Sequence, residues 1–566
     1  MKNNNTSGDV LFVNAKVYTG ERSFTEAVYV SEGRIASAGS NEEVKKAASV
    51  IIGRTEADWI DDVKVIDCGG RTIVPGFSDS HMHLFGLALN LTQAQISDSS
   101  SVGDMVARCR DFAENNPERV KKGIYAAGWN QDLFIGEKRM PGLDDMNEIS
   151  TDIPVCLERT CGHIVCCNSR LLDMMEERGL PLTEEQRMTG IFTEGDVKAP
   201  REIITGYTAE ELAAMVEVAM KRCASFGLTS VASNDAEFVF TDHALVEDAL
   251  ALLYDQGRAP VRYSQQISYS TFRDFEHAVS EGVYKRFGAG GEEGEGSAKV
   301  INTAFRVTEN EWYSDGPLKL FTDGSLGART AHLRAGYADD PGNTGLSTLS
   351  SEDLERHCLA AKEAGIQVVA HGIGDGAVEK IVDVYEKVFG PENPLRCGII
   401  HCQVTDKDLL KRIASLNVPT LVQPIFLDYD IMIAEDRCGH ELASTSYAFK
   451  TLGETGHMSF GTDCPVEDCD PFAGIYCAVA RKRKDGSPDG GWFPGECMDV
   501  YGAVDAYTKE SAWIQFAEDR RGSIKEGFDA DLVVLDRDIF TVRTDDIRDI
   551  RPVLTMTGGE IVFEKE

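Results

Sequence analysis

The sequence predicts an α/β protein: a (β/α)8 TIM barrel, a β-sandwich formed from both chain termini, and an α+β subdomain inserted after barrel strand 1. Apolar β-branched runs alternate with helical patterns through the middle of the chain, which is typical of parallel βα units. Further β-type runs occupy both ends. About 140 residues separate the first two predicted barrel strands, too many for an unstructured loop.

Eight candidate strands make up the predicted barrel, and eight alternating units favour a closed barrel over an open sheet. The strands are expected at residues 72–77, 228–233, 261–269, 317–324, 366–372, 397–402, 419–424 and 457–463. Helices are expected between them. Capping signals that begin with Ser or Thr precede three of these helices, at residues 208–211, 350–353 and 405–408.

The terminal segments are each too short to bury a sheet face alone, so we expect them to pair with each other. The predicted domains are therefore a first β-sandwich part at 1–72, the barrel at 73–515 and a second β-sandwich part at 516–566. The insertion is expected at about 95–205 and would emerge as a βα loop on the face where barrel active sites lie. The Gly- and Glu-rich segment 288–297 is typical of a mobile loop.

Composition narrows the class of protein. The formal charge of −36 argues against nucleic acid and anionic membranes as partners, since such binders cluster Lys and Arg. The acidity itself indicates solubility, or else steering of cationic substrates. Without a signal-peptide run or a membrane-length apolar stretch, a cytoplasmic protein is expected. Fifteen cysteines without framework spacing indicate buried thiols, and a homo-oligomer stays open as an alternative to a monomer.

His81 and His83 form an HxH pair where the first barrel strand ends. Side chains two positions apart on a strand face the same side, so two imidazoles can hold one metal ion there. Three further residues suited to zinc and related ions, His371, His401 and Asp463, each end a different predicted strand. Any one histidine alone is better read as a core residue, but strand ends of a barrel converge, so the set of five predicts a metal site.

Lys319 lies near the end of the fourth predicted strand. An ammonium group has no lone pair and cannot bind a metal. Carboxylation by CO2 would convert Lys319 into a carbamate that bridges two metals. The alternative is an ordinary ion pair, with Asp323 as the candidate partner.

The order HxH, Lys, His, His, Asp on strands 1, 4, 5, 6 and 8 resembles the amidohydrolase superfamily, specifically its amidohydrolase 3 type, the branch with YtcJ-like proteins and N-substituted formamide deformylases. The resemblance runs from about residue 9 to 563. Its matching segments are VPGFSDSHMHL, GWNQDLF, GHIVCCNS, KLFTDGSLGARTA, AHGIGDGAV, VQPIF, GTDCPVE and GSIKEGFDADLVVLD. This chain departs from the family at Ile400 and Cys161, where an acidic residue is usual.

The resemblance implies one or two divalent metal ions, most simply zinc, with CO2 as a lysine carbamate. Carried over by position, the metal ligands are His81, His83, Lys319, His371, His401 and Asp463, the histidines of the first strand holding the more buried ion. Asp463 is also the implied catalytic carboxylate.

The expected function is metal-dependent hydrolysis of a non-peptide, amide-type carbon–nitrogen bond in a small-molecule substrate, through a metal-activated hydroxide. Asp463 would accept the water proton and return it to the leaving nitrogen. Trp129 and His163 are candidate substrate contacts, although core packing explains either equally well. The alternatives are a lactone, carbamate or phosphoester at the same site, or a non-catalytic scaffold.

Overall fold

The computed structural model describes residues 8–60, 62–160, 163–235, 243–281 and 312–565. The predicted loop 288–297 and Cys161 lie outside the described residues. The chain divides into two compact units, which we call the barrel unit and the inserted unit. The barrel unit comprises Met1–Leu84, Met220–Asn234 and Tyr254–Glu566, and the inserted unit comprises Phe85–Ala219 and Asp235–Leu253.

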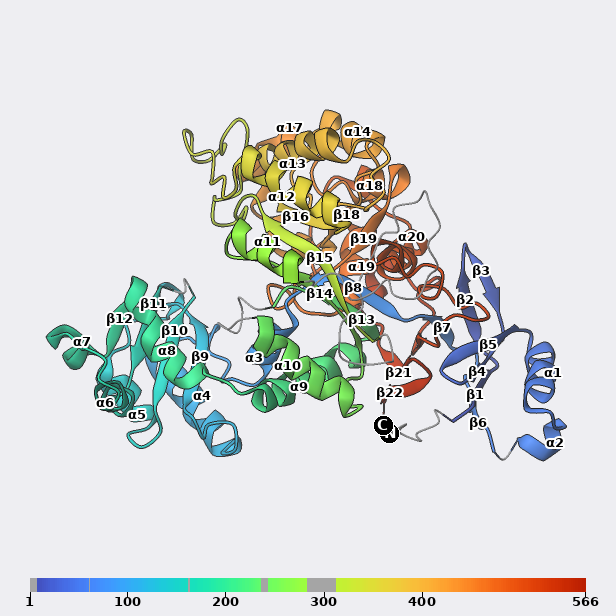
Figure 1. Cartoon of the computed structure of the whole chain (residues 1–566), viewed down its shortest axis with the longest axis horizontal. Coiled ribbons are helices and arrows are strands. Elements are labelled where there is room, and N and C mark those ends of the chain that lie inside the picture. The colour runs from blue at the N-terminus through green and yellow to red at the C-terminus, as the bar shows by residue number, and fades with distance from the viewer. Residues whose placement is uncertain (1–7, 61, 161–162, 236–242, 282–311, 566) are drawn as a thin grey trace. The chain divides into compact units, whose positions relative to one another are not determined.

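An eight-stranded parallel sheet forms the centre of the barrel unit, in the order β19-β18-β17-β16-β15-β14-β13-β8 (Figure 1). It is a nearly closed barrel and bears out the predicted core of the fold. The strands are β8 Phe77–Met82, β13 Leu228–Ser233, β14 Arg262–Ile267, β15 Tyr313–Phe321, β16 Val368–Gly372, β17 Gly398–His401, β18 Thr420–Val422 and β19 Met458–Phe460.

Backbone hydrogen bonds join β8 to the segment that follows β19. The Asp463 N–H donates to the His81 carbonyl at 2.8 Å, and the His83 N–H donates to the Cys464 carbonyl at 2.7 Å. The two segments approach so closely that a Cβ atom at Gly461 would lie 2.7 Å from the His81 nitrogen. A glycine is therefore required where the first and last strands meet.

The first barrel strand is not where the sequence placed it. Thr72–Pro75, the apolar half of the expected strand 72–77, is β7 of a different sheet, and β8 begins only at Phe77. The prediction failed because β8 has the sequence FSDSHM, in which polar residues outnumber apolar ones, although all six are buried. A search for apolar runs overlooks such a strand, because its buried residues are mostly polar.

Helices alternate with the strands along the chain. They are α9 Ala209–Ser225, α10 His243–Asp255, α11 Phe272–Glu281, α12 Ser351–Ala364, α13 Asp375–Val388, α14 Lys407–Ser415, α18 Phe449–Thr455, α19 Pro471–Ala480, α20 Val500–Tyr507 and α21 Lys509–Ile514. Two predicted caps are present, at Thr208 with Glu211 and at Ser350. The third is wrong by one residue: Asp406 caps α14, because the Thr405 hydroxyl donates to the Thr445 carbonyl instead.

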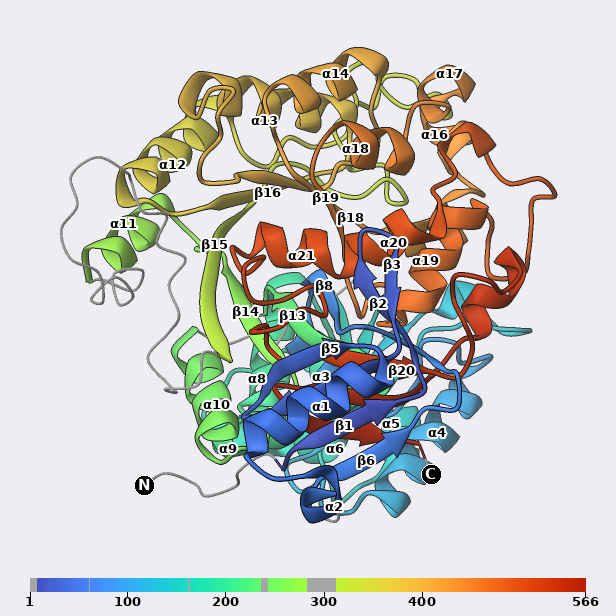
Figure 2. The same cartoon turned by 90° about the vertical axis from the view of Figure 1, so that its right-hand side faces the viewer.

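The barrel unit has two further sheets, and one of them combines strands from both chain ends. The first has the order β5-β4-β1-β6 and consists of N-terminal strands alone. The second has the order β22-β21-β20-β7-β2-β3, so N- and C-terminal strands share it (Figures 1 and 2). Buried residues of both sheets form one cluster that includes Phe12, Val28, Leu532 and Met556. The strands are β1 Val10–Val13, β2 Lys16–Gly20, β3 Ser23–Thr25, β4 Ala27–Ser31, β5 Arg34–Gly39, β6 Lys64–Asp67, β7 Thr72–Pro75, β20 Leu532–Leu535, β21 Pro552–Thr557 and β22 Glu560–Glu564.

The inserted unit has its own four-stranded sheet, in the order β12-β11-β10-β9. Alternate residues of β10 face opposite sides: Leu157 packs in a cluster with α4 and α5, whereas Cys156 packs in a second cluster with α6 and α8. Helices therefore cover both faces. The elements are α4 Val102–Asn115, β9 Ile124–Trp129, α5 Leu143–Ile149, β10 Val155–Arg159, β11 Ile164–Cys167, α6 Ser169–Glu177, β12 Ile191–Thr193 and α8 Lys198–Thr205.

Among the residues that the structure describes, no helix is long and apolar enough to cross a membrane. The fourteen described cysteines carry free thiols, and all but Cys438 and Cys497 are buried.

Candidate metal centre

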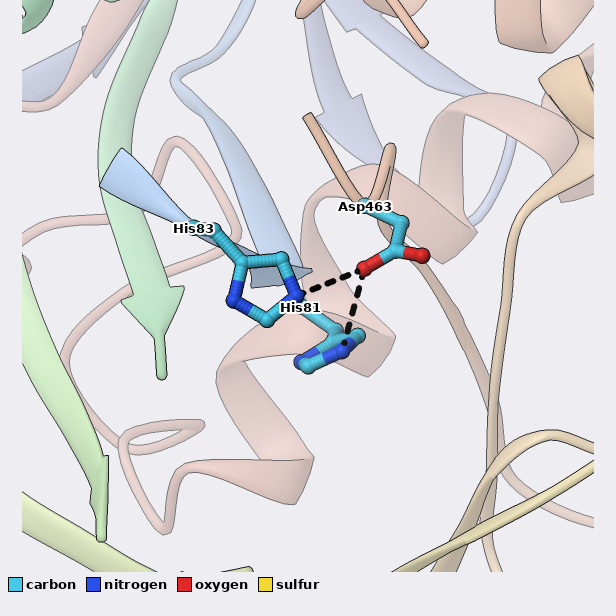
Figure 3. A group of neighbouring side chains, drawn as sticks. All are labelled: His81, His83 and Asp463. Atoms are coloured by element: carbon cyan, nitrogen blue, oxygen red, sulfur yellow. Dashed lines mark ion pairs between the residues drawn. The ribbon is translucent and has the colours of Figure 1, made fainter. Parts of the chain in front are cut away.

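Three buried side chains converge at the junction of the first and last barrel strands. His81 Nε2 lies 3.3 Å and His83 Nε2 lies 3.1 Å from the same oxygen, Oδ1 of Asp463 (Figure 3). His81 is on β8 and His83 directly follows it, whereas Asp463 follows β19. One ligand atom from each residue lies within 4.8 Å of the others, as binding of a single ion requires.

The outer nitrogen of each imidazole faces a carbonyl oxygen, which fixes its protonation. His81 Nδ1 lies 2.6 Å from Gln266 Oε1, and this amide is oriented because its nitrogen donates to the Ser80 carbonyl. His83 Nδ1 contacts the main-chain carbonyl of Asn234. Both Nδ1 atoms must therefore donate, so in the neutral rings both Nε2 atoms present a lone pair to Asp463.

His81 is a neutral imidazole under ordinary conditions. Burial, followed by the charge of Lys319, lowers the pKa of His81 to about 3. Asp463 Oδ1 is itself buried and accepts no hydrogen bond from the part of the chain that the structure describes. The neutral His81 thus turns a nitrogen lone pair toward a carboxylate oxygen with no proton between them, and the Nδ1 contact of His83 places its lone pair at Nε2 whenever that ring is neutral. A divalent cation would stabilise this arrangement.

The two histidines from β16 and β17 lie beside this group. The His401 ring centroid is 5.6 Å from that of His81 and 4.5 Å from that of His371. His401 Nδ1 lies 2.7 Å from Gln423 Oε1, and the Gln423 amide nitrogen donates to the Leu421 carbonyl, so the other His401 nitrogen carries the lone pair. Burial, then the neighbouring His371, lowers the pKa of His401 well below its usual value.

His371 Nε2 lies 3.1 Å from the Gly324 carbonyl and 3.3 Å from Asp323 Oδ1. The Asp323 carboxylate also accepts hydrogen bonds from the backbone N–H groups of His332, Ile373 and Gly374. The Asp323 carboxylate therefore holds the backbone that follows β16 in place. These contacts leave Nδ1 of His371 as its available lone pair.

Lys319 is buried on β15 with 1% of its surface exposed. Its Nζ lies 3.4 Å from His81 Nε2 and 4.8 Å from the centre of the Phe321 ring. A lysine amine thus reaches the edge of the His-His-Asp group from the fourth strand. All six predicted ligands lie on or directly after strands of one barrel.

The family is decided by comparison with known proteins. The model of the amidohydrolase family matches residues 64–563. The chain belongs to the amidohydrolase family. It is 30% identical to the amidohydrolase-family protein YtcJ of Bacillus subtilis (strain 168), over 98% of both chains. It is 24% identical to the N-substituted formamide deformylase of Arthrobacter pascens, again over 98% of both.

Solved structures agree with this assignment. The structure of an uncharacterized metal-dependent hydrolase from Pyrococcus horikoshii OT3 has a TM-score of 0.75 and 26% identity, covering 95% of this chain and 99% of its own. A similar structure from Pyrococcus furiosus has a TM-score of 0.73 and 26% identity, covering 94% and 100%. The protein is a metal-dependent hydrolase of the amidohydrolase family.

The two proposed substrate contacts of this amidohydrolase both lie in the inserted unit. Trp129 ends β9 and is fully buried within the core cluster beside α4. The side chain of His163 is 67% exposed, and its Nδ1 lies 3.2 Å from Glu194 Oε2. Trp129 therefore lies in a packed core, whereas the His163 side chain is accessible to solvent.

Sequence reasoning missed the residues that orient the predicted ligands of this amidohydrolase. Gln266 and Gln423 fix two histidine tautomers, and Asp79 accepts hydrogen bonds from the Thr462 hydroxyl at 2.5 Å and from the His81 N–H at 3.1 Å. Burial raises the pKa of Asp79 to about 7. The available signal was polarity within predicted strands, since a buried polar side chain needs a specific partner.

Proposed function

We propose that this amidohydrolase hydrolyses a non-peptide, amide-type carbon–nitrogen bond with zinc at the His81–His83–Asp463 group. The supporting observation is the meeting of two imidazole lone pairs with a buried carboxylate oxygen. A zinc ion bound there supplies Lewis-acid activation of water and of the substrate carbonyl. The named activity of the Arthrobacter pascens relative, removal of a formyl group from an N-substituted formamide, supports an amide bond.

Asp463 is the proposed proton carrier. Its Oδ1 faces the two imidazoles, and the other carboxylate oxygen points away from them (Figure 3). That second oxygen accepts a proton from the attacking water and then delivers it to the nitrogen that leaves. One water proton reaches the leaving nitrogen through Asp463, the carbon–oxygen bond forms and the carbon–nitrogen bond breaks. The products are a carboxylic acid and an amine, which become a carboxylate and an ammonium ion when the second proton is transferred between them.

A second ion is proposed beside the first. Lys319, carboxylated by CO2, would supply oxygen ligands to both ions, and His371 and His401 would complete the second position. The positions of these side chains around His81 are consistent with such a pair. Trp129 and His163 stay predictions as substrate contacts.

The test is a substrate screen on the purified protein with metal content measured in parallel. N-formyl, N-acyl and cyclic amides form one panel, and lactones, carbamates and phosphoesters of matched size form the other. Turnover in the amide panel that is lost on chelation and restored by zinc supports the proposal. Zinc-dependent turnover confined to the second panel would keep the metal centre and reject the amide bond.

A further inference from the structure

A cavity of about 340 Å³ lies within the inserted unit, and none of the proposed metal ligands lines it. Its volume is in the range of small-molecule sites, roughly 300–1,000 Å³. The end of α4, the start of β9, the end of α8 and the first half of α9 form its walls. The cavity is thus a property of this unit alone.

Both apolar and charged side chains line the cavity. The apolar side chains are Phe112, Ile124, Ile204, Met215 and Val218. The charged residues that line the cavity are Arg119, Lys121, Lys122, Glu118 and Glu211. Lys122 is already engaged, since it pairs with Glu211 and donates to the Gly206 carbonyl, and Lys121 pairs with Glu118.

Arg119 differs from these two lysines. One of its nitrogens, Nη1, lies 3.4 Å from the Leu91 carbonyl, and within the described residues no carboxylate lies at ion-pair distance from it. Arg119 is exposed and is one of the residues that line the cavity. A guanidinium group with free donors can bind a carboxylate through two parallel hydrogen bonds.

The balance of basic and acidic residues around the cavity differs from that of the whole chain. A second hollow of about 470 Å³ shares Lys121 and Lys122 with it. Five basic residues line the two together, Arg119, Lys121, Lys122, Arg170 and Arg178, against four acidic ones, Glu118, Asp152, Glu202 and Glu211. The chain as a whole has 57 basic and 93 acidic residues, so the acidic excess of the chain is absent from these two linings.

We propose that this cavity is a second ligand site, which binds a small amphipathic carboxylate. The apolar body of the ligand lies against Phe112, Ile204 and Met215, and its carboxylate is bound by Arg119. A wholly polar anion would gain nothing from the apolar side chains, and a neutral apolar compound would gain no charge-assisted hydrogen bond from Arg119. The proposal does not depend on the reaction at the metal centre.

Octanoate is the probe, and 1-octanol is its neutral counterpart. Calorimetric titration of the metal-loaded, full-length protein should detect octanoate binding, with octanol bound at least about 10-fold more weakly, the difference expected for a hydrogen bond to a charged group. Arg119→Gln should weaken octanoate binding by a similar factor. Arg110→Gln is the matched control, because Arg110 is exposed on α4 and does not line the cavity.

Two further variants separate this site from the metal centre. Ala214→Phe places a ring in the cavity from an exposed position on α9 and should abolish octanoate binding, whereas His83→Ala should leave it unchanged. Thermal unfolding of each variant verifies that it folds. Absence of octanoate binding at millimolar concentration, equal binding by Arg119→Gln and Arg110→Gln, or binding lost only in His83→Ala would each overturn the proposal.

Discussion

The polarity of individual hydrogen bonds determines what the buried His81, His83 and Asp463 can bind. An imidazole whose Nδ1 donates to a carbonyl presents a lone pair at Nε2, and both rings do so toward one carboxylate oxygen. Had either outer nitrogen faced a donor instead, Nε2 would carry a proton and the group would be a simple hydrogen-bonded cluster. The oxygen acceptors Gln266 Oε1 and Asn234 O therefore favour metal binding as much as the histidines themselves.

Removing both imidazoles of the HxH pair should remove the metal. We expect the double variant His81→Ala/His83→Ala to lose most of its zinc, because only Asp463 would remain of the compact group. Elemental analysis of protein purified by the same route measures this loss. His440→Ala is the control, since His440 is a surface histidine paired with Glu435. Undiminished metal in the double variant would show that the ion lies elsewhere.

Asp463→Asn should separate catalysis from metal binding. Asn keeps one oxygen for the position of Oδ1 but cannot accept a proton, so kcat should fall by about 10²–10⁴-fold with metal content largely retained. Steady-state kinetics on a substrate from the amide panel, together with elemental analysis, provides both readouts. Near-normal turnover in a metal-replete variant would reject Asp463 as the proton carrier.

Carboxylation of Lys319 can be tested by crystallography and by chemical rescue of a variant, with a substrate from the amide panel. If two ions are bound, electron density in a crystal structure should extend beyond Nζ as a carbamate. Activity lost in Lys319→Ala should return in part with added short-chain carboxylic acids, because they can occupy the place of the carbamate oxygens. Density that ends at Nζ while both ions are present would contradict the bridge.

At the scale of elements, local signals fixed the type of most segments, and tertiary contacts shifted their ends. Ser350 accepts a hydrogen bond from the Asp353 N–H and begins α12 as the sequence predicts. At α14 the predicted cap is one residue too early. The Thr405 hydroxyl donates to the Thr445 carbonyl of a neighbouring segment, and Asp406 caps the helix instead. A cap residue competes for partners that only the folded chain supplies.

The predicted cap of α12 contributes a measurable share of stability. Ser350→Ala should lower the free energy of unfolding by about 0.5–2 kcal/mol, since the backbone N–H of Asp353 loses its acceptor. Chemical denaturation measures the change. Ser351→Ala, at the exposed first helical position, serves as the control and should have little effect. Equal stability of the two variants would show that the cap is without consequence.

At the scale of the whole molecule, strands from the two chain ends share one sheet. β7 of the N-terminal region pairs with β20 of the C-terminal region, and β20 pairs with β21. The C-terminal strands β20, β21 and β22 pair with no other strand of the C-terminal region, so this sheet is complete only when β7 of the N-terminal region joins it. The sheet that contains β7 and β20 therefore cannot be completed until nearly the full chain has been synthesised.

Met556 tests this mutual dependence. It is fully buried in the cluster shared by the two sheets, so Met556→Ala should destabilise the protein by about 2–5 kcal/mol. Ile561→Ala, on the partly buried strand β22, should cost clearly less. Thermal or chemical unfolding compares the two. A smaller loss for Met556→Ala than for Ile561→Ala would argue against a common core.

The sequence by itself determined the strands that carry His371 and His401 and the strand that Asp463 follows, because a short apolar run that stops at polar residues is a local feature. It also determined the order of these residues along the chain, which carries the family resemblance. The pattern could not separate β7 from β8, since Pro75 and Gly76 divide two strands of which the second is polar and buried.

Only the tertiary structure decided which atoms meet. His81 and Asp463 are 382 positions apart, and their contact depends on how β8 and the segment after β19 approach each other. The acceptors that fix the tautomers come from β14 and from the residues that follow β13 and β18, and the burial of Trp129 depends on the sheet of the inserted unit. Such contacts arise from packing between distant segments, and local sequence patterns carry no information about their geometry.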